Sequence, residues 1–534
     1  MAADLILYHA KVLTPQLFEA SALNPHYPSQ LVAIKDGRVL AVTRTENLED
    51  FRGPGTMVLD CQGKTVMSGF NDAHCHLVAL AKNMVNPNLG PDKVHSILDI
   101  QREIEGMSRN LPQGDWIRAE GYNEFYLAEK RHPTRWDLDK ATSAHPVKLI
   151  HRSGHAHVLN SLALALVGIS KETPEPPGGI IERDWETGEP NGLLYDMGDF
   201  LSKRVPPLDD EELERGIKLA DRELLSLGIT SIQDMSPGND LGRWQMFRRW
   251  KNEGILKSRL GLMLGIEGFR ELLNCRPGSE PGINMRERAG LRMRDKSGIL
   301  LCGVKIILQE TTGQLSPSQQ ELEPLALQAH ESHLQLAFHA VEESTIQEAC
   351  SILERVLQKS PRINHRHRME HCSVCSLETA KRLASLGAVV VTQPAFIYYS
   401  GERYLRTVPP AELQHLYSIA TLLKAGVRVA AGSDCPVIPP NPFIGIYGAV
   451  MRKAETGESV TPGESIPLLE ALRMYTENAA YASFEEDIKG SVTPGKLADL
   501  VVLSDDPSKV PIEKIKDSRV EMTIIGGEIA YRKF

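Results

Sequence analysis

Apolar and polar positions divide the chain into a β-rich start, a β-rich end and a long middle in which strands alternate with helices. Short apolar runs near the start are separated by turn signals such as Asp36-Gly37. Runs of this kind cover 5–8, 31–34, 39–42 and 57–59 at the start and 499–503, 520–525 and 528–531 at the end. Because neither set has a partner of its own, we expect residues 1–64 and 486–534 to form one small β-sandwich domain from both termini.

The middle of the chain has the pattern of successive βα units around a parallel sheet. Apolar runs that predict strands cover 147–150, 229–234, 260–264, 303–307, 335–339, 368–371, 388–392 and 427–431. The steps from 305 to 339 and from 339 to 371 each match one βα unit. This spacing predicts an α/β fold with a (β/α)8 TIM-type barrel over residues 65–485. The proline- and glycine-rich stretch at 105–205 is expected to be an insertion at the barrel mouth.

Chemically reactive side chains follow the predicted strands. His74 and His76 are two residues apart, so in an extended strand both imidazoles face the same side. Further polar residues at or near the ends of later strands are Lys305, His339, His371 and Asp434. A single histidine at a strand end is more often hydrogen-bonded structure than a ligand, and Asp434 alone could be a turn residue. Five such places at βα intervals favour one shared metal site, because the carboxyl ends of barrel strands form the active-site face.

These residue types suit a divalent metal ion. Imidazole and carboxylate groups bind catalytic zinc, which lowers the pKa of a bound water from about 15.7 to about 7. Asp434 could accept the proton of that water and pass it to a leaving amine. A lysine such as Lys305 is unusual in an apolar strand, but its N6-carboxylated form, a carbamate anion, could bridge two ions. We therefore expect one or two divalent ions per subunit, zinc first, with manganese, cobalt or iron as alternatives.

Composition narrows the class of protein. The chain has 534 residues and a net charge of −9, which argues against broad nucleic-acid binding. No apolar run approaches the roughly 18 residues of a membrane span, and the N-terminus lacks the basic region of a signal peptide. We expect a cytoplasmic protein that acts on a small molecule, and the sequence leaves open whether it forms a homo-oligomer.

Two further motifs are expected to have no role in the metal site. Cys372 and Cys375 have no second cysteine pair to complete a zinc site, and His365 and His367 are expected to be a solvated basic cluster.

Further segments along nearly the whole chain match a set of family motifs. The segment 66–76 is similar to P-G-F-x-D-x-H-x-H, with Ser68 in the place of the usual proline. The other matching segments are 154–164, 177–180, 190–194, 227–234, 368–371, 393–394 and 432–437. Together they resemble the amidohydrolase superfamily, and specifically its YtcJ-like branch (amidohydrolase family 3), to which N-substituted formamide deformylases belong.

The resemblance implies a role for each candidate residue. His74 and His76 would bind a first metal ion, with Lys305 bridging or beside it. His339 and His371 would bind a second ion or complete a site for one. Asp434 would be both a ligand and the proton shuttle. The residues expected to contact substrate are His155, Gln393 and Tyr398, with a loop role as the alternative for His155 and packing as the alternative for Tyr398.

The sequence departs from the branch in two places. Residues 309–311 are Gln-Glu-Thr where Asp-Gly is usual, and 341–343 are Val-Glu-Glu where Gly-Asp is usual. We expect both to lie where residues orient the ligands or contact substrate, so they weaken any substrate assignment by analogy. The implied function is metal-dependent hydrolysis of a C–N bond in an amide, formamide, carbamate or urea-like small molecule. The alternatives are a heterocycle deaminase that uses the same site and a non-catalytic scaffold with the amidohydrolase fold.

Overall fold

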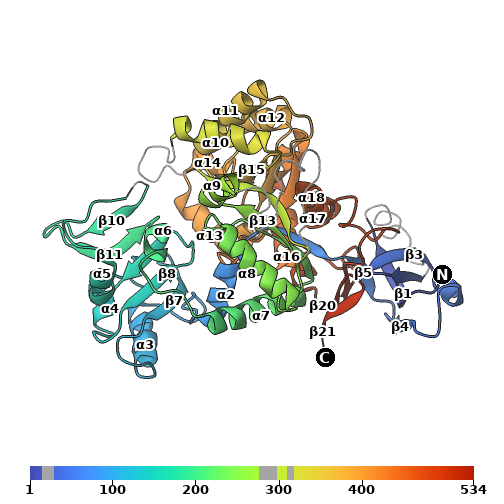
Figure 1. Ribbon diagram of the computed structural model, residues 1–534, viewed down its shortest axis with the longest axis horizontal. Helices are drawn as coiled ribbons and strands as arrows, with labels where there is room; N and C mark the ends of the chain where they lie inside the picture. The colour runs from blue at the N-terminus through green and yellow to red at the C-terminus, as the bar shows by residue number, and fades with distance from the viewer. Residues whose placement is uncertain (15–28, 177, 276–296, 309–317, 534) are drawn as a thin grey trace. The chain divides into compact units, whose positions relative to one another are not determined.

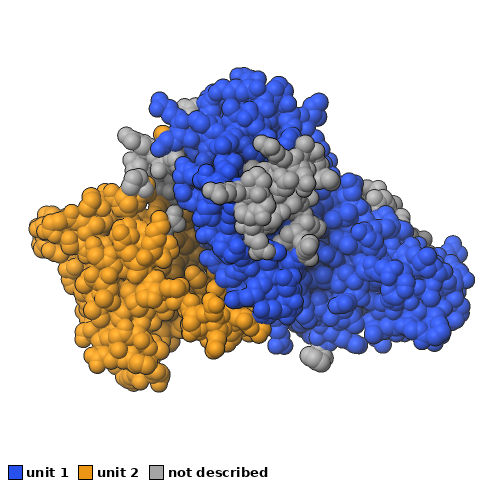
Figure 2. Space-filling view, in the orientation of Figure 1, with its two compact units in different colours: residues 1–76, 221–308, 319–534 blue, residues 77–220, 309–318 orange. Residues whose placement is uncertain are grey.

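The computed structural model describes residues 1–14, 29–176, 178–275, 297–308 and 318–533. Its chain forms two compact units, which Figure 2 shows in different colours. The first unit contains Met1–His76, Asp221–Leu308 and Gln319–Phe534, and the second contains Leu77–Ala220 and Gln309–Ser318. No helix among the described residues is both long enough and apolar enough to cross a membrane.

Eight parallel strands form the centre of the first unit (Figure 1). They are β6 (Phe70–Cys75), β12 (Ile229–Asp234), β13 (Arg259–Leu264), β14 (Leu300–Ile307), β15 (Gln335–Ala340), β16 (Arg368–His371), β17 (Val389–Thr392) and β18 (Arg428–Ala431). They pair in the order of the chain, with β6 at one end and β18 at the other. Near the carboxyl ends of those two strands, Asp434 N–H donates to His74 O at 2.7 Å and His76 N–H donates to Cys435 O at 2.9 Å. These bonds join the two ends of the sheet into a nearly closed barrel, which confirms the predicted fold class.

Helices follow most of the barrel strands. They are α8 (Leu241–Asn252), α9 (Ile266–Asn274), α10 (Gln319–Glu331), α11 (Glu343–Lys359), α12 (Leu377–Ser385), α13 (Ala395–Thr407), α14 (Pro410–Leu413), α15 (Ile419–Lys424), α16 (Pro442–Met451), η3 (Pro462–Glu464), α17 (Leu468–Met474) and α18 (Glu477–Ala482). In α11 the buried residues Ile346, Ala349, Leu353 and Val356 recur at three and four positions, as an amphipathic helix requires. Ser376 begins α12 because its side chain accepts the backbone N–H of Thr379.

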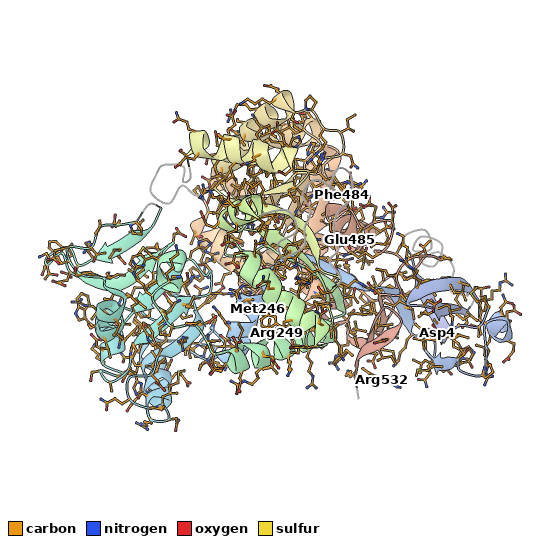
Figure 3. The ribbon with its side chains drawn as sticks, viewed as in Figure 1. Asp4, Met246, Arg249, Phe484, Glu485 and Arg532 are labelled. Atoms are coloured by element: carbon orange, nitrogen blue, oxygen red, sulfur yellow. The ribbon has the colours of Figure 1, made fainter. Side chains whose placement is uncertain are left out.

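The amino-terminal end of the barrel is closed by charged groups rather than by apolar packing alone. Lys489 Nζ lies 2.5 Å from Glu485 Oε2 and the same distance from Ser231 Oγ of β12. The Arg366 guanidinium lies 4.2 Å from the ring centre of Phe484. Phe484 precedes Glu485 in the chain, and Figure 3 labels both residues. These contacts tie the segment after α18 to the starts of the barrel strands.

Strands from both ends of the chain share a second sheet in the first unit (Figure 1). It contains β1 (Leu5–Leu13), β2 (Gln30–Lys35), β3 (Arg38–Arg44), β4 (Met57–Asp60), β5 (Thr65–Ser68), β19 (Leu500–Leu503), β20 (Val520–Ile525) and β21 (Glu528–Arg532), with the short helices η1 (Thr45–Asp50) and η4 (Ile512–Asp517). The strand β5 pairs with β1 on one side and with β19 on the other. Val12, Val66 and Leu500 are buried in one apolar cluster, so the expected pairing of the termini is confirmed. The sheet continues to Ser68, beyond the expected boundary at residue 64.

The second unit has a five-stranded sheet in the order β10-β11-β9-β8-β7. Its elements are α2 (Leu77–Val85), α3 (Ile97–Ser108), β7 (Ile117–Tyr122), α4 (Arg135–Asp139), β8 (Val147–His151), β9 (Ala156–Leu159), α5 (Ser161–Val167), β10 (Ile180–Arg183), β11 (Pro190–Tyr195), α6 (Gly198–Ser202) and most of α7 (Asp210–Ser226). Ile100, Tyr122, Leu149 and Val158 belong to its own apolar core. The expected insertion at 105–205 lies within this unit. The strand predicted at 147–150 belongs here and not to the barrel, because a short apolar run does not specify which sheet it joins.

Candidate metal centre

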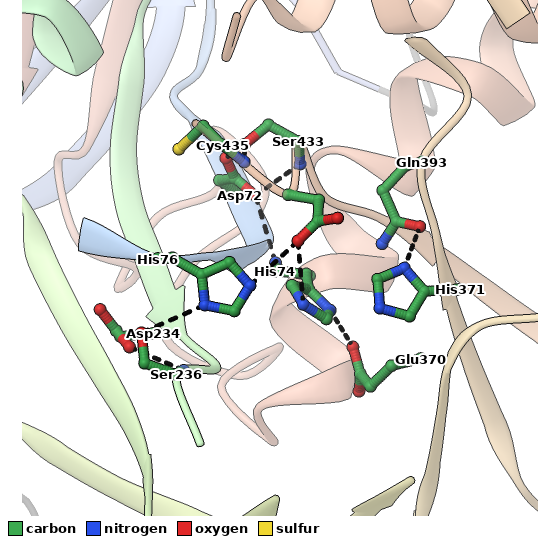
Figure 4. Close-up of polar contacts among 12 residues, drawn as sticks. Asp72, His74, His76, Asp234, Ser236, Glu370, His371, Gln393, Ser433 and Cys435 are labelled. Atoms are coloured by element: carbon green, nitrogen blue, oxygen red, sulfur yellow. Dashed lines mark hydrogen bonds and ion pairs between the residues drawn. The ribbon is translucent and has the colours of Figure 1, made fainter. Parts of the chain in front are cut away.

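The carboxyl ends of the barrel strands bring together the imidazoles predicted from the sequence, of which Figure 4 shows His74, His76 and His371. The ring centres of His74 and His371 are 4.7 Å apart, those of His339 and His371 are 4.4 Å apart, and those of His74 and His76 are 5.3 Å apart. Asp434 Oδ1 lies 3.0 Å from His76 Nε2 and 3.4 Å from His74 Nε2. One cluster therefore contains residues from β6, β15, β16 and the loop after β18.

Oxygen atoms behind the cluster decide which nitrogen of each imidazole is available. His74 Nδ1 lies 2.6 Å from Glu370 Oε2, and His371 Nδ1 lies 2.9 Å from Gln393 Oε1. Both oxygens accept, so each neutral ring carries its proton on Nδ1 and has a lone pair on Nε2. Within the described part of the chain, neither of these two buried Nε2 atoms has a hydrogen-bond partner.

These orphaned nitrogens fit a divalent metal ion. Ligand atoms of His74, His371 and Asp434 lie within 4.8 Å of one another, and all three residues are buried. A buried lone pair without a partner is unfavourable, and a cation bound between these atoms would satisfy it. Two nitrogens and one carboxylate oxygen form a donor set typical of catalytic zinc.

The charge state of the cluster also suits a cation. Burial lowers the pKa of His74 well below its ordinary value, and the nearby charge of Lys305 adds to this. Burial lowers the pKa of His371 to about 4, although Asp434 opposes the shift. Burial raises the pKa of Asp434, but the hydrogen bond from His76 and the charges of His371 and Lys305 outweigh it and lower the pKa. At neutral pH the three groups are therefore two neutral imidazoles and a carboxylate.

Lys305 lies in β14 with only 2% of its surface exposed. Its Nζ atom is buried and has no hydrogen-bond partner among the described residues. Burial lowers the pKa of Lys305 to about 8, against the opposing charges of Glu370 and Asp434. At pH 7 about a tenth of this side chain is therefore the neutral amine, the form that reacts with electrophiles.

Two residues that hold the cluster in place were not identified in the sequence. Glu370 and Arg368 are fully buried in β16, and Arg368 Nε donates to Glu370 Oε1 at 2.6 Å. The sequence did contain one signal: Arg368 and Glu370 are opposite charges two residues apart in a predicted strand, and charges buried in a strand need partners inside the protein. The spacing of two residues predicts that both side chains lie on the same face of the strand. It does not predict that His74 lies opposite that face.

The three expected substrate contacts lie in different surroundings. Gln393 accepts a hydrogen bond from His371, so it orients a candidate ligand. Tyr398 in α13 packs edge-on against Tyr447, with ring centres 5.7 Å apart, and Lys516 Nζ lies 5.6 Å from its ring centre. His155 belongs to the second unit, where its Nδ1 lies 2.7 Å from Asp196 Oδ1. Substrate contact by these residues stays a prediction.

Other sequence interpretations need correction. His365 and His367 are not solvated but buried, at 6% and 0% exposure, because the loop before β16 folds under the barrel. Glu343, expected near the ligands, instead accepts the backbone N–H of Ser376 at 2.9 Å and so supports the start of α12.

The Cys372 thiol has the properties of an inert thiol. The hydrogen bond with Cys375 and burial raise its pKa well above the ordinary value. The motif residue Pro177 and the departure at 309–311 lie outside the described residues.

Curated proteins of similar sequence span nearly the whole chain. The protein YtcJ of Bacillus subtilis (strain 168) is 28% identical over 522 residues, which cover 95% of this chain and 96% of that protein. The N-substituted formamide deformylase of Arthrobacter pascens is 29% identical over 555 residues, which cover 99% of this chain and 98% of that protein. The protein LONG AFTER FAR-RED 3 of Arabidopsis thaliana is 28% identical over 529 residues, covering 94% and 88%.

Solved structures share the fold at lower identity. A metal-dependent hydrolase of Pyrococcus horikoshii OT3 superimposes with a TM-score of 0.72 at 22% identity, over 95% of this chain and 99% of that chain. A metal-dependent hydrolase of Pyrococcus furiosus gives a TM-score of 0.70 at 23% identity, over 95% and 100%. At these identities the superpositions establish the barrel with its terminal sheet and carry no further argument.

The sequence profile of the amidohydrolase family matches residues 57–531, a range that includes every candidate ligand. The match and the cluster of His74, His371 and Asp434 together support a metal-dependent hydrolase. The resemblance seen in the motifs is thus confirmed by a match over most of the chain. This chain belongs to the amidohydrolase family.

Proposed function

We propose that the protein hydrolyses a C–N bond in a small amide, formamide, carbamate or urea-like molecule. The observation that carries the proposal is the pair of buried, unpartnered Nε2 atoms of His74 and His371 beside the Asp434 carboxylate. The relative from Arthrobacter pascens is named as a formamide deformylase, which supports a C–N bond as the target. Zinc is the first choice of ion because its usual ligands are imidazole and carboxylate, with manganese, cobalt or iron as alternatives.

The residues present divide the work of such a reaction. His74, His371 and Asp434 would hold the ion, with His76, His339 and Lys305 beside them. A divalent ion bound here would lower the pKa of a water molecule from about 15.7 to about 7.

Asp434 would accept a proton from that water and deliver it to the leaving nitrogen, the task of a general acid–base group. Its buried carboxylate is already ionised at neutral pH, because His76, His371 and Lys305 lower its pKa. His76 orients it: His76 Nε2 lies 3.0 Å from Asp434 Oδ1, while His76 Nδ1 lies 3.1 Å from Ser236 Oγ.

We also propose that Lys305 is carboxylated when two ions are bound. The neutral Nζ amine would attack CO2 and lose a proton, which forms an N–C bond and leaves a carbamate anion. The charge balance supports this, because Arg368 neutralises Glu370 and Asp434 is left as the charged donor. One carboxylate suits one divalent ion, whereas a second ion calls for a second negative charge.

Mass spectrometry of the native protein tests the carbamate. We expect a mass increase equal to one CO2, which disappears on acidification. The variant Lys305→Arg keeps a positive charge but cannot form the carbamate, so it should show no increase. Unmodified Lys305 in protein that holds two ions per chain would contradict this assignment and favour a site for one ion.

The experiment that tests the activity is a screen of amides, formamides, carbamates and ureas against metal-reconstituted protein. An amine and an acid as products would support the proposal, and ammonia released from a ring carbon would instead identify a deaminase. The variant Asp434→Asn is the matched control for contaminating activity. The proposal fails if protein purified without chelator holds no divalent ion and stays inactive after zinc, manganese or cobalt is supplied.

A further inference from the structure

We propose that Glu370 is a positioning residue for the metal centre. It holds His74 in the tautomer and ring orientation that present Nε2 to the ion, and Arg368 holds Glu370 in turn. The inference rests on the proposed metal-dependent function. It adds a chain of buried contacts, Arg368 to Glu370 to His74, that determines how tightly the ion is bound.

The contact between Glu370 and His74 is short and shielded from water. His74 Nδ1 lies 2.6 Å from Glu370 Oε2, and both side chains have 0% exposure. Hydrogen bonds to a charged acceptor are shorter and stronger than those between neutral groups. The bond therefore fixes the proton of His74 on Nδ1 and keeps its Nε2 lone pair toward Asp434, 3.4 Å away.

Arg368 locks the carboxylate from the opposite side. Its guanidinium donates from Nε to Glu370 Oε1 at 2.6 Å and from a terminal nitrogen to Oε2 at 3.1 Å. The same guanidinium donates to Ala73 O of β6 at 2.7 Å and to Gln233 Oε1 of β12. A two-pronged ion pair of this kind leaves Glu370 little rotational freedom. Because Ala73 immediately precedes His74, one guanidinium sets both the backbone and the ring partner of that imidazole.

Fold stability does not explain this arrangement. Taking an arginine and a glutamate fully out of water is expensive, and apolar residues of similar volume are often as stabilising or more so. Arg368 and Glu370 are both at 0% exposure inside the barrel. Apolar residues in these two positions would leave the His74 Nδ1–H group without a hydrogen-bond acceptor. The pair is therefore best explained by the imidazole that it orients.

The second candidate ligand is held differently. His371 Nδ1 faces the neutral amide oxygen of Gln393, at 2.9 Å, whereas His74 faces a carboxylate. A carboxylate partner makes an imidazole the more basic ligand, and losing such a partner typically weakens metal binding by roughly 10–100-fold. We therefore expect His74 to be the stronger of the two donors, and Glu370 to be the group that makes it so.

The variant Glu370→Gln tests the role of the Glu370 carboxylate while keeping nearly the same side-chain volume. Glutamine removes the negative charge and keeps one acceptor oxygen, and its amide N–H group takes the place of the other oxygen, where it would face a donor, either Arg368 Nε or His74 Nδ1. The matched control is Glu485→Gln, which alters another buried, ion-paired carboxylate at the opposite end of the barrel, 6% exposed and 2.5 Å from Lys489 Nζ. Both variants lose a buried ion pair, but only Glu370→Gln removes the carboxylate charge beside a candidate ligand.

The measurement is the zinc dissociation constant of metal-free protein, determined by competition with a chromophoric chelator. We expect Glu370→Gln to bind zinc roughly 10–100-fold more weakly than wild type and Glu485→Gln to match wild type. The visible spectrum of the cobalt-substituted protein should change in Glu370→Gln alone, because the spectrum reports the ligand geometry. A purely structural role would lower the melting temperature of both variants and leave affinity and spectrum unchanged.

Two further results keep the inference falsifiable. If Glu370→Gln does not fold, Arg368→Lys keeps the positive charge but loses the fork, and a several-fold weaker zinc affinity is expected. Wild-type affinity in whichever of these variants folds would overturn the positioning role. Wild-type protein that binds no zinc would instead overturn the proposed function, so the two failures are distinguishable.

Discussion

Lowering the pH from 7 to 5 is expected to weaken the fold through two buried histidines at the amino-terminal end of the barrel. His330 Nε2 donates to Ser360 O at 2.8 Å, and His330 Nδ1 accepts from His367 Nε2 at 2.8 Å. His367 Nδ1 in turn accepts the backbone N–H of Leu336 at 2.9 Å. In both rings the protonated nitrogen therefore donates to an acceptor and the unprotonated nitrogen accepts from a donor. A second proton on either ring would make two N–H donors face each other.

The size of the effect follows from the shift of one pKa. Burial, helped by the charge of Arg362, lowers the pKa of His330 from 6.5 to about 4. The unfolded chain then binds a proton at pH values where the folded chain does not, so the free energy of unfolding falls as the pH drops from 6.5 toward 4. For His330 alone, proton linkage predicts a loss of roughly 1–2 kcal/mol at pH 5, once screening by solvent is allowed for. Above pH 7 this contribution is complete and constant.

Urea unfolding followed by circular dichroism at pH 7, 6 and 5 measures this loss. We expect the variant His330→Gln to lose less stability over this range than wild type, because one titrating imidazole is gone. The matched control His333→Gln removes an exposed imidazole three residues away and should keep the wild-type slope. Parallel pH profiles for wild type and His330→Gln would refute the reasoning.

Three further predictions concern the metal centre. Asp434→Asn should lower turnover at least roughly 100-fold, and unchanged turnover on any substrate that the screen identifies would remove Asp434 from the chemistry. Gly432→Ala would place a Cβ 2.5 Å from the backbone nitrogen of His74, so it should weaken zinc binding, whereas Gly463→Ala, with open space around the new Cβ, should not. Removing the metal with a chelator should lower the melting temperature. Zinc at about 100 times its dissociation constant should restore about 2.7 kcal/mol of stability, and a melting temperature insensitive to zinc would contradict a specific site.

Most barrel strands could be predicted from the sequence because each is a short apolar run between turn signals. The segments expected at 229–234 and 368–371 coincide with β12 and β16, and those at 335–339 and 388–392 differ from β15 and β17 by one residue. The candidate ligands could be predicted for the same reason, since they follow apolar runs at intervals of a βα unit. Hydrophobic patterning thus determined where strands lie and which side chains end them.

Which sheet a strand joins could not be read from that pattern. The run at 147–150 resembles a barrel strand in composition, but its partners are β7 and β9 of the second unit. The polar cluster at 365–367 reads as exposed, because the surface that covers it comes from distant parts of the chain. Burial depends on packing between distant parts of the chain, so a local sequence pattern does not predict it.

The sequence by itself determined a barrel of alternating strands and helices, the pairing of the two chain ends and a set of imidazoles at strand ends. Only the tertiary structure decided that the ligand atoms of His74, His371 and Asp434, residues 63 to 360 positions apart in the chain, lie within 4.8 Å of one another. It also decided that Glu370 faces His74, and so which ring nitrogen is free. The physical reason is that strand periodicity specifies the side on which a residue lies, whereas closure of the barrel specifies what lies opposite it.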